Sequence, residues 1–147
     1  MSRPAEACTP HRGPMLLIDA MLSAEGEIAR SETTIRADHL FFIPGHVGFE
    51  LMAQTVNAFD GWRRVDRGLE PAIGFLLGCR SYKAARAYFA EGERLVTEVR
   101  SLLKNPEDEM VSFECRILDA SGAAIAAAIV NAYRPHDPDA FLKAQLA

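Results

Sequence analysis

The residues most able to do chemistry lie close together between positions 39 and 50. His39 supplies a group that titrates near neutral pH and Glu50 supplies a carboxylate, and such a pair can move protons during a reaction. Between them, Pro44 and Gly45 form a turn just before an amphipathic helix, whose first turn leaves backbone N–H groups free to hold an oxygen atom. The spacing therefore predicts a site at the start of this helix.

Each of these residues also has a purely structural explanation. His39 could be a loop histidine that packs on the aromatic pair Phe41 and Phe42. Glu50 could simply interact with the helix dipole, which is worth less than about 1 kcal/mol. Spacing alone leaves these alternatives open.

The helix that positions the site runs from the Pro44-Gly45 turn to about Val65. Its expected apolar face follows the i, i+3, i+4, i+7 spacing and consists of Phe49, Met52, Ala53, Val56 and Phe59. A polar line of Glu50, Gln54 and Asn57 lies beside it. A cation and a glycine, Arg67-Gly68, end the helix.

Most of the remaining chain has the patterns of β-strands. We expect strands at 15–23, 28–37, 73–79, 94–103, 110–118 and 123–133, with 80–89 extended or bulged. Short turns join most of them, and the alanine-rich composition of the last would also allow a helix. These elements predict an α+β fold in which an antiparallel sheet of five to six strands wraps around one long central helix.

Length and composition limit the possible classes of protein. The 147 residues fit a single domain, with 1–9 as a flexible lead-in and 136–147 as a tail. A net charge of −4 argues against nucleic acid as a partner. There is no apolar run long enough to span a membrane and no secretory signal, so we expect a cytoplasmic protein with no membrane association. The histidine spacing predicts no metal site, and the three separate cysteines are expected to be free thiols.

Two motifs, together with the strands around them, resemble those of a known family. PHRGPMLLID at 10–19 and GHVGFELMAQ at 45–54, followed by a glycine-bearing strand and EGERLVTEVR at 91–100, are similar to the hot-dog-fold 3-hydroxyacyl-acyl-carrier-protein dehydratases. The likeness extends from Pro10 to about Arg134. Within that superfamily the chain looks most like the dehydratase-like proteins of aryl-polyene and related polyketide pathways, which share G-x-ELMAQ and the IGFLLG strand.

The resemblance implies the sheet-around-helix fold and a homodimer, joined edge to edge through its sheets, with acyl tunnels at the subunit interface. It places the catalytic histidine on His39, the acid on Glu50 of the other subunit, and the N–H that holds the thioester carbonyl on Gly45. The loop between His39 and Glu50 is shorter here than in the fatty-acid dehydratases, so His46 is a competing candidate. Gln54 could orient Glu50 or form hydrogen bonds at the dimer interface.

The resemblance implies dehydration of a 3-hydroxyacyl thioester to the trans-2-enoyl thioester on an acyl carrier protein, with no cofactor beyond the phosphopantetheine that carries the substrate. An acyl thioesterase is one alternative, and a non-catalytic acyl-binding subunit paired with an active homologue is another. A homodimer is expected, and two dimers could pair into a tetramer. Two groups of cations, at 63–67 and 80–86, could receive an acidic carrier protein or could be an ordinary solvated face.

Overall fold

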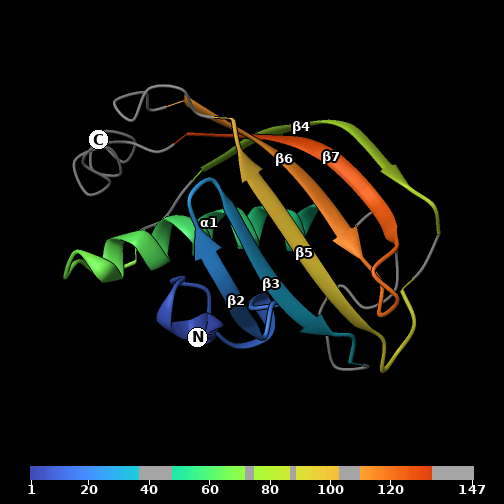
Figure 1. Cartoon of the computed structure of the whole chain (residues 1–147), viewed down its shortest axis with the longest axis horizontal. Coiled ribbons are helices and arrows are strands. Elements are labelled where there is room, and N and C mark those ends of the chain that lie inside the picture. Colours follow the sequence, from blue (N-terminus) through green and yellow to red (C-terminus); the bar gives the residue numbers. More distant parts are fainter. Residues whose placement is uncertain (37–47, 72–74, 87–88, 103–109, 134–147) are drawn as a thin grey trace.

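The computed structural model describes residues 1–36, 48–71, 75–86, 89–102 and 110–133. In chain order its elements are β1 (Arg3–Pro4), the 3₁₀ turns η1 (Ala5–Ala7) and η2 (Gly13–Met15), β2 (Ala20–Glu25), β3 (Ile28–Thr34), α1 (Gly48–Asp66), β4 (Phe75–Ala84), β5 (Arg94–Ser101), β6 (Met110–Leu118) and β7 (Ala124–Tyr133). The strands form one antiparallel sheet in the order β1-β2-β3-β5-β6-β7-β4, which curves around α1 (Figure 1). The expected sheet-around-helix architecture is confirmed, with seven strands among the described residues instead of five or six.

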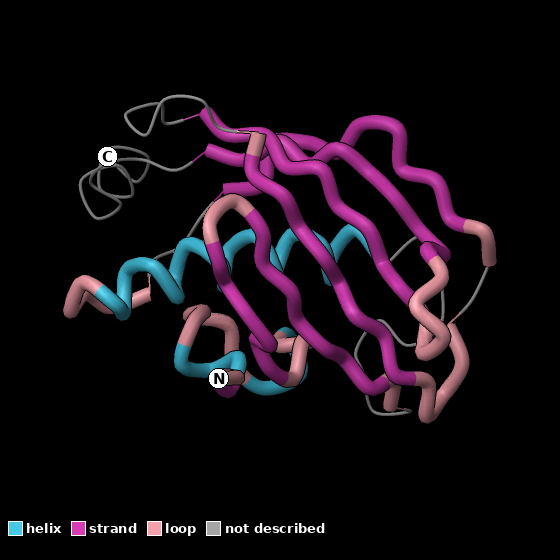
Figure 2. Tube along the Cα trace, viewed as in Figure 1, coloured by secondary structure: helices cyan, strands magenta, loops and turns pink. Residues whose placement is uncertain are grey.

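Tight turns connect β2 to β3 and β6 to β7. Gly26 joins β2 to β3 with a φ of 57°, and Gly122 joins β6 to β7 with a φ of 87°. Both angles lie in the left-handed region that glycine adopts readily. In the second turn, the Asp119 carboxylate accepts hydrogen bonds from the N–H groups of Ser121 and Ala123, at 2.9 and 3.1 Å. These turns set the register of the two hairpins that Figure 2 shows as adjacent strands.

Successive side chains of a strand point alternately to a buried face, which packs on α1, and to an outer face, which carries charge. In β6 the buried side chains are Val111, Phe113, Cys115 and Ile117, while Glu114 and Arg116 are exposed. At the centre of the outer face, Glu98 of β5 pairs with Arg30 of β3 and Arg116 of β6, with N–O distances of 2.6 Å in both ion pairs. The sheet therefore has one apolar face and one charged face.

Helix α1 fills the concave face of the sheet. Of its expected apolar face, Met52, Val56 and Phe59 are buried, whereas Phe49 and Ala53 are only half-buried. The buried set is wider than predicted, because strands β2 to β7 and the N-terminal turn η1 all contact the helix. It also includes Gly48, Leu51, Gln54, Thr55, Ala58 and Gly61.

The N-terminal residues do not form the flexible lead-in that the sequence suggested. Arg3 stacks on Trp62, 3.9 Å from the ring centroid, and forms an ion pair with Asp66 at 2.5 Å. Ala5, Cys8 and Thr9 are almost completely buried. The expectation is wrong for residues 3–9, because small side chains and one arginine attach this segment to α1 without any periodic apolar pattern.

The first long strand also begins later than predicted. The segment 15–19 does not join the sheet ladder as part of a strand, and β2 starts only at Ala20. Pro14 lies in the 3₁₀ turn η2, and the N–H groups of Leu17 and Ile18 point to the Gln54 side chain instead of a neighbouring strand. The other predicted strands occur, with ends that match or shift by a few residues, and residues 80–84 of the segment predicted as extended or bulged (80–89) belong to β4.

Candidate active site

Glu50 lies in the first turn of α1, where backbone N–H groups have no partner within the helix and favour a negative charge. Glu50 is half-buried, and its Oε1 accepts a hydrogen bond from Gln54 Nε2 at 3.2 Å. The two residues are one helical turn apart, so they share a face of α1. The predicted carboxylate is therefore held by a neighbour on the same helix.

Gln54 links this carboxylate to residues 14–19 of the first motif, called here the PMLLID segment. Its Oε1 accepts the N–H groups of Leu17 and Ile18, at 2.8 and 3.4 Å, and its Nε2 also donates to the carbonyl of Met15 at 2.7 Å. With Glu50 included, the buried amide uses both of its N–H donors and accepts two bonds at its oxygen. Of the two roles left open for Gln54, this geometry favours orienting Glu50 within one subunit.

The PHR part of the first motif fixes the turn that precedes this segment. The Thr9 hydroxyl lies 2.7 Å from His11 Nδ1 and donates to Oδ1 of Asn57 in α1, also at 2.7 Å. Arg12 donates to the carbonyl oxygens of Thr9 and His11, at 2.6 and 2.7 Å. The two motifs that carry the resemblance are therefore in contact through Gln54, and the Thr9–Asn57 hydrogen bond adds a contact just outside both of them.

On its other side, the first turn of α1 meets a tyrosine that the sequence did not single out. Tyr82 of β4 reaches the helix start, where its hydroxyl lies against the backbone of Gly48. Burial raises the pKa of Tyr82, as does the nearby thiol of Cys79, while the hydrogen bond from the Gly48 N–H lowers it in part. Tyr82 thus stays a neutral phenol over the physiological pH range.

Three of the predicted site residues lie outside the described part of the chain. His39, Gly45 and His46 all fall within 37–47, directly before α1. Of the predicted constellation, the structure brings together Glu50 and Gln54. The roles assigned to the other three stay predictions.

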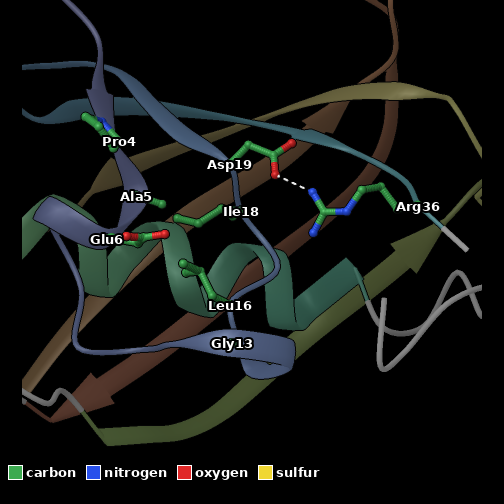
Figure 3. A pocket seen from close by; sticks show the side chains of 8 residues that line it. All are labelled: Pro4, Ala5, Glu6, Gly13, Leu16, Ile18, Asp19 and Arg36. Carbon is green, nitrogen blue, oxygen red and sulfur yellow. Dashed lines mark hydrogen bonds and ion pairs between the residues drawn. The ribbon is translucent and has the colours of Figure 1, made fainter. Parts of the chain in front are cut away.

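A hollow of about 240 Å³ is lined in part by the PMLLID segment (Figure 3). Asp19 and Arg36 form an ion pair of 3.0 Å on one side of it, and Glu6 comes from the N-terminal segment on the other. Leu16 and Ile18 provide its apolar surface. The N–H groups of Leu17 and Ile18 donate hydrogen bonds to Gln54, which in turn binds Glu50. The hollow and Glu50 therefore lie near the same short segment of chain.

Within the described residues, no cluster of histidine, cysteine, aspartate and glutamate side chains could hold a metal ion. The three cysteines are free, and burial raises the pKa of the thiols of Cys8, Cys79 and Cys115. A raised thiol pKa suppresses the reactive thiolate. None of the described helices has the length and apolar composition needed to cross a bilayer.

The two predicted cation groups have different surroundings. At the end of α1, Arg64 donates to the carbonyl of Glu70 at 2.7 Å, and Arg63 lies over the ring of Phe59, 4.1 Å from its centroid. In the second group, Arg86 forms a bidentate pair with Glu93 at 3.1 and 2.5 Å, whereas Arg80 and Lys83 are exposed on β4. In the second group, therefore, Arg80 and Lys83 are exposed to solvent, whereas the charge of Arg86 is paired with that of Glu93.

Comparison with protein families gives a match to almost the whole chain. The ApeP-like family, described as ApeP dehydratase, matches residues 3–143. The chain belongs to the ApeP-like dehydratase family. No curated protein sequence matches it significantly.

One solved structure agrees with this assignment, and two others share the fold. The dehydratase heterocomplex ApeI:P from Xenorhabdus doucetiae contains a chain with 26% identity and a TM-score of 0.83, with 92% of this chain and 93% of that chain covered. A thioesterase-like protein with coenzyme A from Streptococcus pneumoniae has 12% identity and a TM-score of 0.57, over 77% and 85% of the two chains. A variant of the phenylacetic acid degradation protein PaaI from Thermus thermophilus has 17% identity and a TM-score of 0.57, over 78% and 91%. The last two likenesses establish the fold alone, and together with the first they make this a hot-dog fold.

Proposed function

We propose that this ApeP-like protein dehydrates a 3-hydroxyacyl thioester, carried on an acyl carrier protein, to the trans-2-enoyl thioester. The observation that carries the proposal is the carboxylate of Glu50, fixed by Gln54 at the N-terminus of the helix inside a hot-dog fold. The family is a dehydratase family. A carboxyl group held at this position can give a proton to a leaving hydroxyl.

In the proposed reaction, His39 removes a proton from the carbon next to the thioester carbonyl. The N–H of Gly45 stabilises the negative charge that develops on the carbonyl oxygen. Glu50, in its protonated form, gives its proton to the 3-hydroxyl as the C–O bond breaks, so that water leaves and the double bond forms. The proton taken by His39 then returns to Glu50 through solvent, which restores both groups.

We also propose an assembly and a location for the protein, as the sequence led us to expect. The protein would act in the cytoplasm as a homodimer or a pair of dimers, with histidine and acid contributed by opposite subunits. It would need no metal and no cofactor other than the phosphopantetheine of its substrate. The exposed cations Arg80 and Lys83 on β4 are available for an acidic carrier protein.

A second candidate is a hot-dog subunit that works together with a different, active hot-dog chain. One observation favours it: the similar structure from Xenorhabdus doucetiae is described as a heterocomplex. In that case the chain would bind or stabilise the acyl group while its partner supplied part of the machinery. A thioesterase remains the other alternative, because similar structures of this fold include a thioesterase-like protein bound to coenzyme A.

Turnover of 3-hydroxyacyl thioesters on an acyl carrier protein tests these possibilities. We expect the purified protein to form enoyl product, detected by absorbance and mass, and we expect Glu50→Gln and His39→Ala to abolish it. Loss with His46→Ala and not with His39→Ala would move the base to position 46. Release of free thiol without enoyl product would indicate a thioesterase. Absence of product until an active hot-dog partner is added would establish the second candidate.

A further inference from the structure

The edge strand β4 carries a distortion next to the candidate active site. Ser81 has a φ of 57°, a left-handed conformation that non-glycine residues in strands rarely adopt. Around it the pairing with β7 slips: Arg80 pairs with Ile129 and Lys83 pairs with Ala127, so three steps along β4 match two along β7. This is a β-bulge, a feature that redirects side chains and often lies beside active sites.

The bulge aims Tyr82 at the helix. Arg80 and Lys83, which flank Ser81 and Tyr82 in the sequence, are exposed. Tyr82 is half-buried and packs on the hydrophobic core. Its hydroxyl takes a hydrogen bond from the N–H of Gly48, the first residue of α1. A Cβ at position 48 would overlap that hydroxyl, so a glycine is required for the contact.

Successive residues of an α-helix are about 100° apart, so Gly48 and Glu50 point to nearly opposite sides of the first turn. On the side of Gly48, the turn is held by Tyr82, together with Phe89 and Ile117. On the side of Glu50, it is held through Gln54 and the PMLLID segment. Tyr82 therefore cannot reach the carboxylate itself, but it fixes the backbone that carries it.

We infer that Tyr82, presented by the bulge at Ser81, is a positioning residue that sets the first turn of α1 and thereby the location of Glu50. This inference rests on the proposed role of Glu50 in the reaction. A positioning role predicts an effect on the chemical step that exceeds the effect on substrate binding, since displacing a reacting group by about 1 Å costs up to a hundredfold in rate.

The test compares Tyr82→Phe, Gly48→Ala and the double variant with wild type, by kcat and KM for dehydration and by urea unfolding. We expect Tyr82→Phe to lower kcat about ten- to a hundredfold with KM within about twofold. We expect Gly48→Ala to be less harmful in the Tyr82→Phe background, because removing the hydroxyl makes room for the new Cβ. Ser81→Gly is the matched control: it keeps the bulge without the strain, and its kcat should stay within about twofold.

An unchanged kcat in Tyr82→Phe, a rise in KM alone, or additive effects in the double variant would each overturn the inference. Full activity in Glu50→Gln would overturn it as well, since Tyr82 would then act through another group. A wild-type protein without dehydration would count against the proposed function instead. The unfolding free energies of Tyr82→Phe, Gly48→Ala and the double variant can be measured without any turnover. If the two losses of stability are not additive, the contact between positions 48 and 82 is supported; if they are additive, the contact is ruled out.

Discussion

The side-chain amide of Gln54 forms hydrogen bonds to the carboxylate of Glu50 and to three backbone groups of the PMLLID segment at the same time. This single buried side chain, 1% exposed, connects the helix to the N-terminal motif. The connection explains why the two motifs occur together: one provides the amide, and the other provides the backbone that fixes it.

Gln54→Met would keep the length of the side chain and remove all four hydrogen bonds. The N–H groups of Leu17 and Ile18 and the carbonyl of Met15 would lose their partner in a buried place, so we expect a loss of about 3 kcal/mol in the free energy of unfolding. Urea denaturation measures this. Glu50→Gln is the control, because it can still accept the bond from Gln54; its stability should change by less than about 0.5 kcal/mol while turnover is lost. Equal stability of both variants would contradict the network.

Gly61→Ala should separate the N-terminal segment from α1. A Cβ at position 61 would lie 1.7 Å from the carbonyl oxygen of Cys8, so one backbone must move. We expect a loss of about 1 to 3 kcal/mol and faster proteolysis near residue 8. At Gly78 the same Cβ would meet no atom within 4 Å, so Gly78→Ala serves as the control. Unchanged proteolysis in Gly61→Ala would show that the segment is not held there.

Two buried hydroxyls facing the helix can be replaced with little harm. Among the described residues, Thr33 and Thr97 have no hydrogen-bond partner for their side-chain oxygens and are at most 1% exposed. Valine has the same shape without the polar group, so we expect Thr33→Val and Thr97→Val to be neutral or stabilising by up to about 1 kcal/mol. Thermal or urea unfolding measures the change.

Thr55→Val is the matched control for these substitutions. The hydroxyl of Thr55 donates to the carbonyl of Leu51 at 2.7 Å and lies 2.7 Å from the hydroxyl of Ser31. Its removal leaves Ser31 without that partner, and we expect a loss of about 1 to 2 kcal/mol. A similar loss in Thr33→Val would mean that this hydroxyl has a partner after all, such as a bound water.

Glu98 should contribute to the loss of stability in acid. Burial alone would raise the pKa of its carboxyl, but the hydrogen bonds from Arg116 and Arg30 together outweigh this and hold it below the ordinary value. A pKa lower in the folded than in the unfolded state gives stability that is present above the unfolded pKa of about 4.3 and disappears as the pH falls through the folded pKa. We expect Glu98→Gln to cost about 1 to 3 kcal/mol at pH 7 and to flatten the decline below about pH 5.

Unfolding free energies measured between about pH 3 and 7 check this expectation. Glu114→Gln on the same face is the control, since Glu114 is exposed and forms no ion pair within the described residues. It should change neither the stability at pH 7 nor the slope. An unchanged slope in Glu98→Gln would assign the acid sensitivity to other carboxyl groups.

Periodic patterns made most of the fold predictable. The alternation in 110–118 gave a strand with the same bounds in the structure, and the apolar spacing after Gly45 gave the long helix. Both patterns arise because a repeating face is buried against one surface. The pair formed by Glu50 and Gln54 could be predicted for the same reason, since residues one turn apart share a helix face.

What the sequence could not predict depends on contacts between distant segments. The late start of β2 follows from Gln54, which takes the N–H groups of Leu17 and Ile18 that a strand would have used. The burial of Cys8 and Thr9 depends on the absence of a side chain at Gly61. Tyr82 is directed at the helix start, at Gly48, by the bulge in which Ser81 takes a left-handed conformation, and a serine in an extended segment gives no signal of that.

The attachment of the N-terminal segment at both ends of α1 has a consequence for how the protein opens. Residues 3–9 hold the last turns of the helix through Trp62, Asp66 and Gly61, and residues 15–18 hold the first turns through Gln54. One continuous stretch of chain therefore spans a helix about 28 Å long. Local opening in proteins often involves contiguous cooperative units, and we expect this stretch and α1 to exchange their amide hydrogens as one of them. We therefore expect local opening at the chain start to be coupled to the first turn of α1 and to Glu50, although the two lie at opposite ends of the helix.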